Sequence, residues 1–344
     1  MSDHRGAANG LWAAGARANG MRANGLRAAG ARANGMRAAG ALAALAVAAG
    51  CSGAPVAASA AAPGAGRGPS PGSTTAFALP STGPCAPAKA APNPPAVAAR
   101  FRGHLEFLHL PTGEPATPTR TVVVYRPAVP DRASLPIVYL LHGLPGNPTS
   151  AVVDPGFREQ VDTWTARGRP FVVVAPDGNA ANVADTEWGD DVHGRVQLQS
   201  WVLHTVIPIV EGAHRRPARL RAIAGFSMGA FGAMDYYLRH REVWGQVVAL
   251  AGYWGLEDPD KIFGTTAATQ RPWEPLVLAP AHGAGGRVLL VGSCRDTDAV
   301  MLAALRRAGA NVVYWNRRGG HTWLLVRNNL PEILGWLFAG WRSP

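Results

Sequence analysis

Short apolar runs recur along the chain after about residue 98, and most of them are continuous rather than alternating. A continuous apolar run is typical of a strand in a parallel sheet, because helices cover both faces of such a sheet. The pattern predicts strands over 121–127, 137–143, 171–178, 220–227, 246–252, 287–292 and 311–316. The run at 104–111 is expected to form an antiparallel edge beside the first of these strands.

Longer segments with helical spacing lie between the apolar runs. They predict helices over 149–167, 195–214, 229–241, 297–309 and 327–340. This alternation predicts an α/β fold, in which a mostly parallel, doubly wound sheet carries helices on both faces. In such sheets the reactive groups collect at the carboxyl ends of the strands, so we look for candidate chemistry there.

The first 51 residues differ from the rest in composition and pattern. Residues 16–40 repeat small residues, Asn and Arg, and offer no apolar face wide enough to pack. Residues 38–50 carry no charge and have the length of the apolar region of a signal peptide, which is too short to span a bilayer. The stretch AAGC at 48–51 resembles a bacterial lipobox, with Ala48 where Leu is usual, and predicts lipidation of Cys51.

These features predict an extracytoplasmic protein that is anchored to the membrane through a lipid on Cys51. Secretion without a lipid is one alternative, and a cytoplasmic protein is the second. Met36 is an alternative start for the same signal segment. Residues 52–97 are rich in Ala, Pro, Gly and Ser and are predicted to form a disordered tether, which leaves 98–344 as one domain.

Two other cysteines and the net charge bear on the predicted location and on the class of partner. Outside the cytoplasm two neighbouring thiols oxidise, so a Cys85–Cys294 disulfide is expected, with two unpaired thiols as the alternative. The net charge is +11, but six Arg and one Asp within the first fifty residues supply +5 of it. The rest of the chain is only mildly basic, and composition therefore does not favour a nucleic-acid partner.

The sequence GFSMG at 225–229 places a serine between two glycines. In a chain with 41 Gly this spacing also arises by chance, so a structural serine is the alternative. The context favours chemistry, because a predicted strand ends just before Ser227 and a predicted helix begins just after it. A nucleophilic serine of an α/β enzyme stands at such a strand-to-helix turn. Ser227 is therefore the candidate nucleophile.

A serine hydroxyl needs a general base, and on this kind of fold the order along the chain is Ser, acid, His. His321 follows the last predicted strand and two glycines, and it is the candidate base. The acid is expected after the strand at 287–292, where Asp296 and Asp298 both qualify. Asp296 is preferred, because Asp298 is well placed to cap the helix that follows.

An oxyanion hole needs two backbone N–H groups near the nucleophile. Met228, the residue after the serine, is expected to supply one. The loop HGLPGN at 142–147 is expected to supply the other, with Leu144 as the first choice and Gly143 as the second. The side chain of His142 is expected to form a hydrogen bond within this loop rather than to act on a substrate.

The domain resembles the putative esterase family of α/β-hydrolases, which includes S-formylglutathione hydrolases, feruloyl esterases and antigen 85-type mycolyltransferases. The resemblance rests on YLLHGLPGN at 139–147, VVAPDGN at 173–179, GFSMGAFGA at 225–233 and GGHTW at 319–323. It implies an α/β-hydrolase fold with Ser227 as nucleophile and His321 as base. Family members place the acid in the loop after the strand or in the following helix, so the resemblance leaves the acid open.

The expected activity is hydrolysis of carboxylic esters through an acyl-enzyme. An acyltransferase of the mycolyltransferase type and a secreted, non-catalytic binding protein are the alternatives. No cofactor and no metal are expected. Four aromatic residues are candidates for the wall of a site for a small-molecule, lipid or sugar ester, with core packing as the alternative role: Trp188, Tyr253, Trp254 and Trp273.

Overall fold

The computed structural model describes residues 88–130, 132, 134–213, 215–292 and 297–342. Four residues singled out from the sequence lie outside these ranges: the predicted lipidation site Cys51, the predicted disulfide partners Cys85 and Cys294, and the preferred acid Asp296. In the part of the chain that the model describes, no helix has both the length and the apolar character that a membrane span requires.

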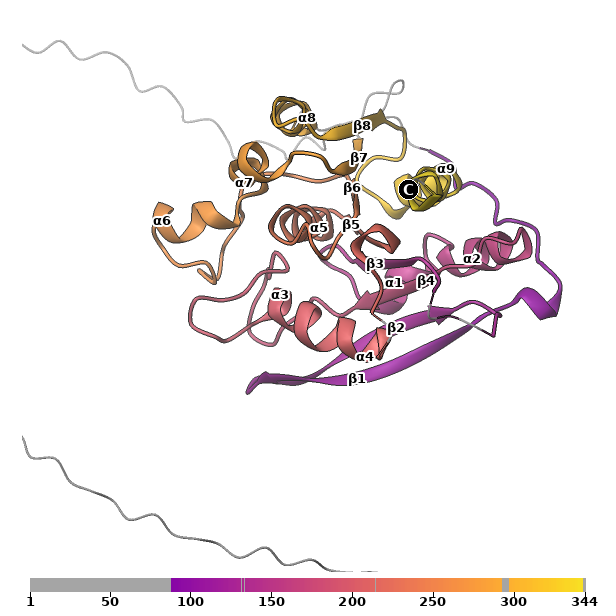
Figure 1. Ribbon diagram of the computed structural model, residues 1–344. Helices are drawn as coiled ribbons and strands as arrows, with labels where there is room; N and C mark the ends of the chain where they lie inside the picture. The colour runs from indigo at the N-terminus through magenta and orange to yellow at the C-terminus, as the bar shows by residue number, and fades with distance from the viewer. Residues whose placement is uncertain (1–87, 131, 133, 214, 293–296, 343–344) are drawn as a thin grey trace, which may run out of the picture. The chain divides into compact units, whose positions relative to one another are not determined.

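The described residues form a mixed sheet whose strand order is β1-β2-β4-β3-β5-β6-β7-β8 (Figure 1). The strands are β1 His104–Glu114, β2 Thr117–Arg126, β3 Ile137–Leu141, β4 Val172–Pro176, β5 Arg221–Phe226, β6 Gln246–Leu250, β7 Arg287–Gly292 and β8 Asn311–Asn316. The hairpin of β1 and β2 is antiparallel, as predicted, and neighbouring strands from β4 to β8 are parallel. Each predicted strand is confirmed to within a few residues.

Helices cover both faces of the sheet (Figure 1). They are α1 Pro148–Val153, α2 Phe157–Ala166, α3 Leu198–Trp201, α4 Ile207–Glu211, α5 Met228–Arg239, α6 Ala267–Gln270, α7 Pro275–His282, α8 Thr297–Arg307 and α9 Trp323–Arg342. One apolar cluster joins α1, α2 and α9 to one face, and the other joins α3, α4, α5, α7 and α8 to the opposite face. The fold is therefore the predicted doubly wound α/β fold.

The central strands show why the apolar runs are continuous. In β3, Tyr139 belongs to the cluster on one face, whereas Val138 and Leu140 belong to the cluster on the other. All three side chains are at most 1% exposed. Since successive side chains of a strand point to opposite faces, a strand covered on both sides has no position left for a polar residue.

Two predicted helices are interrupted in the structure. The segment predicted as one helix over 149–167 splits into α1 and α2, because Pro155 and Gly156 lie between them and Gly156 has φ 83°. The segment predicted over 195–214 contains a π-helical turn, Val202–Val206, between α3 and α4. Pro208 cannot donate a backbone hydrogen bond, and its ring opposes a regular turn before it, which accounts for the wider turn.

The start of α9 is attached to a segment that precedes the sheet. The N–H of Ala91 donates to Asn328 Oδ1 at 2.7 Å, and Arg327 Nε donates to the carbonyl of Ala91 at 3.0 Å. Asn328 Nδ2 also donates to the carbonyl of Lys89 at 2.9 Å. The last ten residues of the predicted tether, 88–97, thus include positions that hydrogen-bond to the domain, while the rest of the tether lies outside the described residues.

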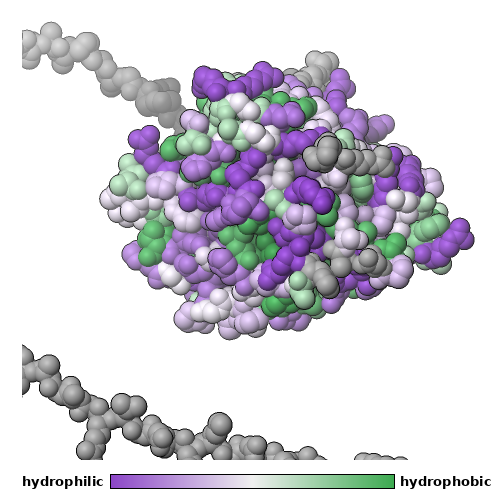
Figure 2. All heavy atoms as spheres, in the orientation of Figure 1, coloured by the Kyte–Doolittle hydropathy of each residue, from purple (hydrophilic) through white to green (hydrophobic). Residues whose placement is uncertain are grey.

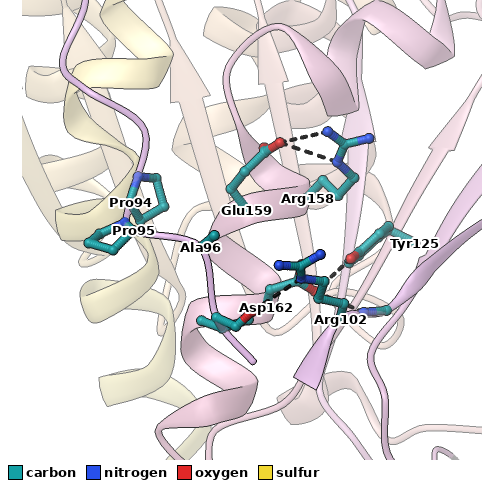
Figure 3. Close-up of a pocket in the computed structure, with 10 residues that line it drawn as sticks. Pro94, Pro95, Ala96, Arg102, Tyr125, Arg158, Glu159 and Asp162 are labelled. Atoms are coloured by element: carbon teal, nitrogen blue, oxygen red, sulfur yellow. Dashed lines mark hydrogen bonds and ion pairs between the residues drawn. The ribbon is translucent and has the colours of Figure 1, made fainter. Parts of the chain in front are cut away.

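A cavity of about 390 Å³ lies between this N-terminal segment and α2 (Figure 3). Its polar groups are already engaged: Tyr125 Oη donates to Asp162 at 2.6 Å, and Arg158 pairs with Glu159 at 2.8 Å. Tyr125 lies opposite Val173 at the start of β4, so the cavity is at the amino ends of the parallel strands. Reactive groups of doubly wound sheets collect at the carboxyl ends of the strands. This cavity therefore lies where the N-terminal segment packs on the domain and is not a candidate active site.

Hydrophobic side chains on the face shown in Figure 2 lie in small patches between polar ones. The large hydrophobic residues that are exposed come from different elements and loops: Phe107, Leu144, Val153, Val192, Ile209, Val277 and Val300. Scattered exposure of this kind is ordinary for a protein surface. Leu144 is the exception, because it belongs to the loop that the sequence assigns to the oxyanion hole.

A buried charge network closes the amino end of β5. Arg221 donates from Nε and Nη2 to the two carboxylate oxygens of Glu211, at 2.8 and 2.9 Å. Tyr139 Oη and the N–H of Arg216 also donate to Glu211, at 3.0 and 2.8 Å. Burial alone would raise the pKa of Glu211, but the hydrogen bonds from Arg221 and Arg216 and the positive charges of these residues together outweigh it and lower the pKa.

Glu211→Ala is expected to lower the free energy of unfolding by about 3–5 kcal/mol, because it leaves two buried guanidinium groups without their carboxylate. The lowered pKa means that the carboxylate stabilises the fold above its unfolded-state pKa of 4.5, and that this contribution is lost as the pH falls through the lower folded-state value. Urea unfolding measures both effects. The matched control is Glu242→Ala, whose side chain is 71% exposed and which should change stability by less than about 0.5 kcal/mol. Equal effects of the two substitutions would contradict this account of the network.

Candidate active site

Ser227 stands at a sharp bend between β5 and α5. Its backbone has φ 57° and ψ −121°, a strained combination for a residue with a side chain. Its N–H donates to the carbonyl of Leu250 on β6 at 3.0 Å, and its own carbonyl accepts from the N–H of Ala230 at 2.8 Å. The strand-to-helix turn predicted around this serine is therefore present, and neighbouring elements hold it on both sides.

Two glycines permit this bend. A Cβ on Gly225 would overlap the carbonyl oxygen of Gly229, and a Cβ on Gly229 would overlap the carbonyl oxygen of Leu141 on β3. Both obstacles are backbone atoms, which cannot move aside as a flexible side chain can. The helix α5 thus crosses the sheet so closely that only glycine fits at these two positions.

His321 lies beside the serine. Its Nε2 atom is 2.7 Å from Ser227 Oγ, a hydrogen-bond distance. The residue lies in the loop between β8 and α9, after Gly319 with φ 138° and Gly320 with φ 59°. Both φ values are in the region that favours glycine, so this pair turns the backbone and brings the imidazole over the carboxyl end of β5. The structure brings together the two residues that the sequence proposed as nucleophile and base.

Asp298, the alternative acid, lies in the first turn of α8 and is 2% exposed. Its Oδ1 atom accepts a hydrogen bond from Trp254 Nε1 at 3.3 Å. Burial raises the pKa of Asp298 to about 6, and the indole N–H opposes part of that rise. Among the described residues the hydrogen-bond partner of this carboxylate is Trp254 rather than His321. The preferred acid, Asp296, is outside the described residues.

The predicted oxyanion donors belong to two segments that adjoin the serine, the loop after β3 and the start of α5. The N–H groups of Gly143, Leu144 and Met228 form no hydrogen bond within the described part of the chain. A Cβ built on Gly143 would be 3.1 Å from Ser227 Cβ, so this loop runs directly past the nucleophile. Met228 is the first residue of α5, where the helix dipole also favours a negative charge. Backbone donors are therefore available where an oxyanion would form.

The imidazole of His142 holds the loop that carries Leu144. Its Nδ1 atom is 2.9 Å from the carbonyl oxygen of Gly143, and its Nε2 atom accepts from the N–H of Gly178 at 2.9 Å. The proton is therefore assigned to Nδ1. Asn179 Nδ2 adds a bond to the carbonyl of Gly146 at 2.9 Å. The expected hydrogen bond within the loop is confirmed, and the ring also connects this loop to the one after β4.

The four aromatic residues proposed to line the substrate site have other contacts. Trp188 is fully buried, and its Nε1 donates to the carbonyl of His142 at 3.1 Å. Tyr253 donates to the buried Glu187 at 2.6 Å, and Trp254 is 2% exposed beside Asp298. The core-packing alternative therefore describes Trp188 and Trp254, because their rings present no surface to a substrate.

Trp273 is the fourth of these residues. It packs on Phe263 with ring centroids 4.9 Å apart, and the guanidinium of Arg239 lies over the ring, 4.2 Å from its centroid. An aromatic ring covered by a cation and by a second ring is engaged within the protein. Trp273 also does not line the pocket beside His321.

A pocket of about 330 Å³ adjoins the Ser227–His321 pair. Its lining consists of residues from two loops, the end of β5 and the start of α9: Gly143, Leu144, Pro145, Phe226, His321, Thr322 and Trp323. Phe226 and Trp323 are the aromatic residues here, and the sequence analysis did not select them. The available signal was position alone, since each is next to or two residues from a proposed catalytic residue.

Within the described part of the chain, no group of three His, Cys, Asp or Glu side chains is placed to hold a metal ion. The remaining features are a doubly wound sheet, a strained serine at a strand-to-helix bend, a histidine within hydrogen-bond reach and free backbone donors. Together they define an α/β-hydrolase.

The chain belongs to the family described as Putative esterase, whose model matches residues 116–337. The match includes every element from β2 to most of α9. It confirms the family that the motifs indicated.

Individual relatives agree with this assignment. An esterase of Mycobacterium tuberculosis is 32% identical over 114 residues, which are 30% of this chain and 22% of that protein. The chain thus spans about a fifth of the length of this relative. A ferulic acid esterase structure has a TM-score of 0.61 at 19% identity and covers 70% of this chain and 99% of its own. An S-formylglutathione hydrolase from Agrobacterium tumefaciens has a TM-score of 0.56 at 20% identity and covers 69% and 95%. These structures are similar in fold.

Gly225→Ala is expected to destabilise the protein by about 3 kcal/mol, because the added methyl group overlaps the backbone of α5. The matched control is Gly335→Ala, within α9, where an added Cβ meets nothing within 4 Å. That substitution should stabilise the protein by about 0.5–1 kcal/mol through helix propensity. Chemical denaturation measures both values, and a neutral Gly225→Ala variant would show that the close crossing is not needed.

Proposed function

We propose that this protein is a serine esterase that hydrolyses carboxylic esters through an acyl-enzyme. The observation that carries the proposal is the 2.7 Å separation of His321 Nε2 and Ser227 Oγ at the strained bend. Strain of this kind is found at functional sites, where it aims a side chain at a substrate. A serine hydrolase active site needs a base within hydrogen-bond reach of the nucleophile, and the pair meets that requirement.

The first half of the reaction forms the acyl-enzyme. Ser227 Oγ attacks the ester carbonyl carbon while His321 Nε2 takes the hydroxyl proton. The carbonyl oxygen becomes an oxyanion, which the N–H groups of Leu144 and Met228 bind. Each such donor contributes about 3 kcal/mol of transition-state stabilisation. The ester C–O bond then breaks, and the imidazolium gives its proton to the leaving alcohol oxygen. In the second half, water attacks the acyl-enzyme carbonyl while His321 takes its proton. The bond to Ser227 Oγ then breaks, the imidazolium returns the proton to Ser227, and the carboxylic acid is released.

The acid that orients His321 is proposed to be Asp296. The order of the three residues along the chain fits this assignment, since Asp296 follows β7 and precedes the histidine. The contact of Asp298 with Trp254 supports the same choice, because its Oδ1 atom accepts a hydrogen bond from the buried indole rather than from the imidazole. An acid in this role holds one tautomer of the base and stabilises the imidazolium.

Ser227→Ala is expected to lower kcat/KM for a model ester such as p-nitrophenyl acetate by at least about 10⁴-fold and to abolish labelling by a fluorophosphonate probe. The reason is that Ser227 Oγ is the hydroxyl oxygen that lies 2.7 Å from the nitrogen of the proposed base, His321 Nε2. His321→Ala should cause a loss of similar size, and the double variant should lose no more than either single one.

Ser150→Ala is the matched control, because this serine caps the exposed start of α1 and should leave labelling unchanged. Equal labelling of the wild type and of Ser227→Ala, or no labelling of either, would favour the non-catalytic binding protein. Supplying a sugar alcohol together with water and identifying the products separates hydrolysis from acyl transfer. Free acid is the expected main product.

The two candidate acids are separated by asparagine substitutions. Asp296→Asn is expected to lower kcat by about 10⁴-fold through the wrong tautomer of the base, whereas Asp298→Asn should remain within about tenfold of the wild type. Burial raises the folded-state pKa of Asp298 to about 6, above the unfolded-state value of 3.8, so the stability present below pH 3.8 is lost as the pH rises through 6.

The Asp298→Asn variant should therefore gain stability relative to the wild type between pH 4 and pH 7, as urea titrations at each pH would show. A large kcat loss in Asp298→Asn with an active Asp296→Asn variant would reverse the assignment.

A further inference from the structure

The pocket beside His321 has a chemical character that restricts the substrate. Among the described residues, its lining includes no Asp, Glu, Lys or Arg. The hydroxyl of Thr322, which also lines it, donates to the carbonyl of Gly319 at 2.7 Å. Leu144 and Pro145 add apolar surface on the side of the oxyanion loop. A group bound here therefore meets apolar walls and few side-chain hydrogen-bond partners.

Aromatic rings form one wall of this pocket. The rings of Phe226 and Trp323 are stacked, with centroids 4.9 Å apart and planes inclined by 30°. The imidazole of His321 lies 5.0 Å from the same Phe226 ring. Phe226 is 7% exposed and acts as the base of the stack, whereas Trp323 is only half-buried. Trp323 thus offers the larger free aromatic surface to a bound group.

The position of the pocket indicates which half of the ester it receives. When the ester C–O bond breaks, the electron pair goes to the leaving oxygen, which takes its proton from His321 Nε2. The leaving alcohol must therefore lie beside the imidazole, within hydrogen-bond reach of that nitrogen. The residues that continue the wall from the imidazole are Thr322 and Trp323.

We propose that this pocket binds the alcohol half of the substrate and that the alcohol is uncharged and carries an aromatic ring, with Trp323 as the residue that determines this selectivity. The inference rests on the proposed esterase function and adds the substrate class to it. In the part of the lining that the structure describes, a charged alcohol finds no counter-ion and a polyol finds few side-chain partners, so burial of either leaves polar groups unsatisfied. An aromatic ring instead gains contact area and ring stacking.

The test compares acetates that share one acyl group: benzyl, cyclohexylmethyl, ethyl and glycerol acetate. The wild type should show the highest kcat/KM for benzyl acetate. Trp323→Leu should lower the ratio of benzyl to ethyl acetate kcat/KM by about fivefold, the size of one aromatic contact. Trp323→Phe, which keeps a ring, should keep most of that ratio.

Trp336→Leu is the matched control. Trp336 lies on the same helix, α9, but its ring packs beneath the guanidinium of Arg287, with the charge 4.0 Å from the ring centroid. The same substitution there removes an indole without touching the pocket, and the benzyl-to-ethyl ratio should stay within about twofold of the wild type.

Several results would overturn the inference while the proposed function stands. One is a wild type whose kcat/KM for ethyl or glycerol acetate equals that for benzyl acetate, a measurement that needs no variant. Another is an unchanged ratio in Trp323→Leu. A third concerns ethyl phenylacetate, whose aromatic ring is in the acyl half. If Trp323→Leu lowered kcat/KM for this ester relative to ethyl acetate but left the benzyl-to-ethyl acetate ratio unchanged, the pocket would be assigned to the acyl half. Failure of the function itself looks different, because Ser227→Ala would then cleave every ester as the wild type does.

Discussion

The close crossing of β5 and α5 is the constraint on which the rest of the site depends. Gly225 and Gly229 let the backbone of the helix touch the backbone of the strands, and the residues between them have no room for a gradual turn. Ser227 takes up the whole change of direction in one strained residue. Its hydroxyl consequently stands at the carboxyl edge of the sheet, beside the first N–H groups of α5, where a nucleophile and an oxyanion donor are both needed.

The parallel sheet then brings three loops to that point. The loops after β3, β5 and β8 leave the same edge, so residues far apart in sequence meet there: Gly143 contacts the serine from one side and His321 from the other. Each loop has its own support. His142 connects the first loop to the backbone of Gly178, and α9 continues directly from the histidine loop. The site is precise because its parts are extensions of a rigid sheet.

Buried aromatic and acidic side chains pack beneath the carboxyl edge of the sheet, namely Trp188, Trp254 and Asp298. Trp188 packs against Gly232 of α5 and donates to the loop before Gly143. Asp298 and Trp254 pair beneath the carboxyl ends of β6 and β7. The rings of Trp188 and Trp254 are buried within the protein, whereas Phe226 and Trp323 line the pocket beside the imidazole of His321.

The sequence by itself determined the strands, the order of the main helices and the pairing of Ser227 with His321, because these follow from burial on both faces of a sheet and from the fixed chain order of this fold. It did not determine which aromatic residues line the pocket. Trp188 and Trp323 look alike in a sequence, and only packing separates them, since one ring is closed in by Gly178 and Gly232 while the other borders open space. The breaks at Gly156 and before Pro208 were visible locally, yet their effect on helix geometry depends on the sheet against which each helix packs. Tertiary structure alone also placed the carboxylate of Asp298 beside the indole of Trp254, because that residue is 44 positions away in the chain.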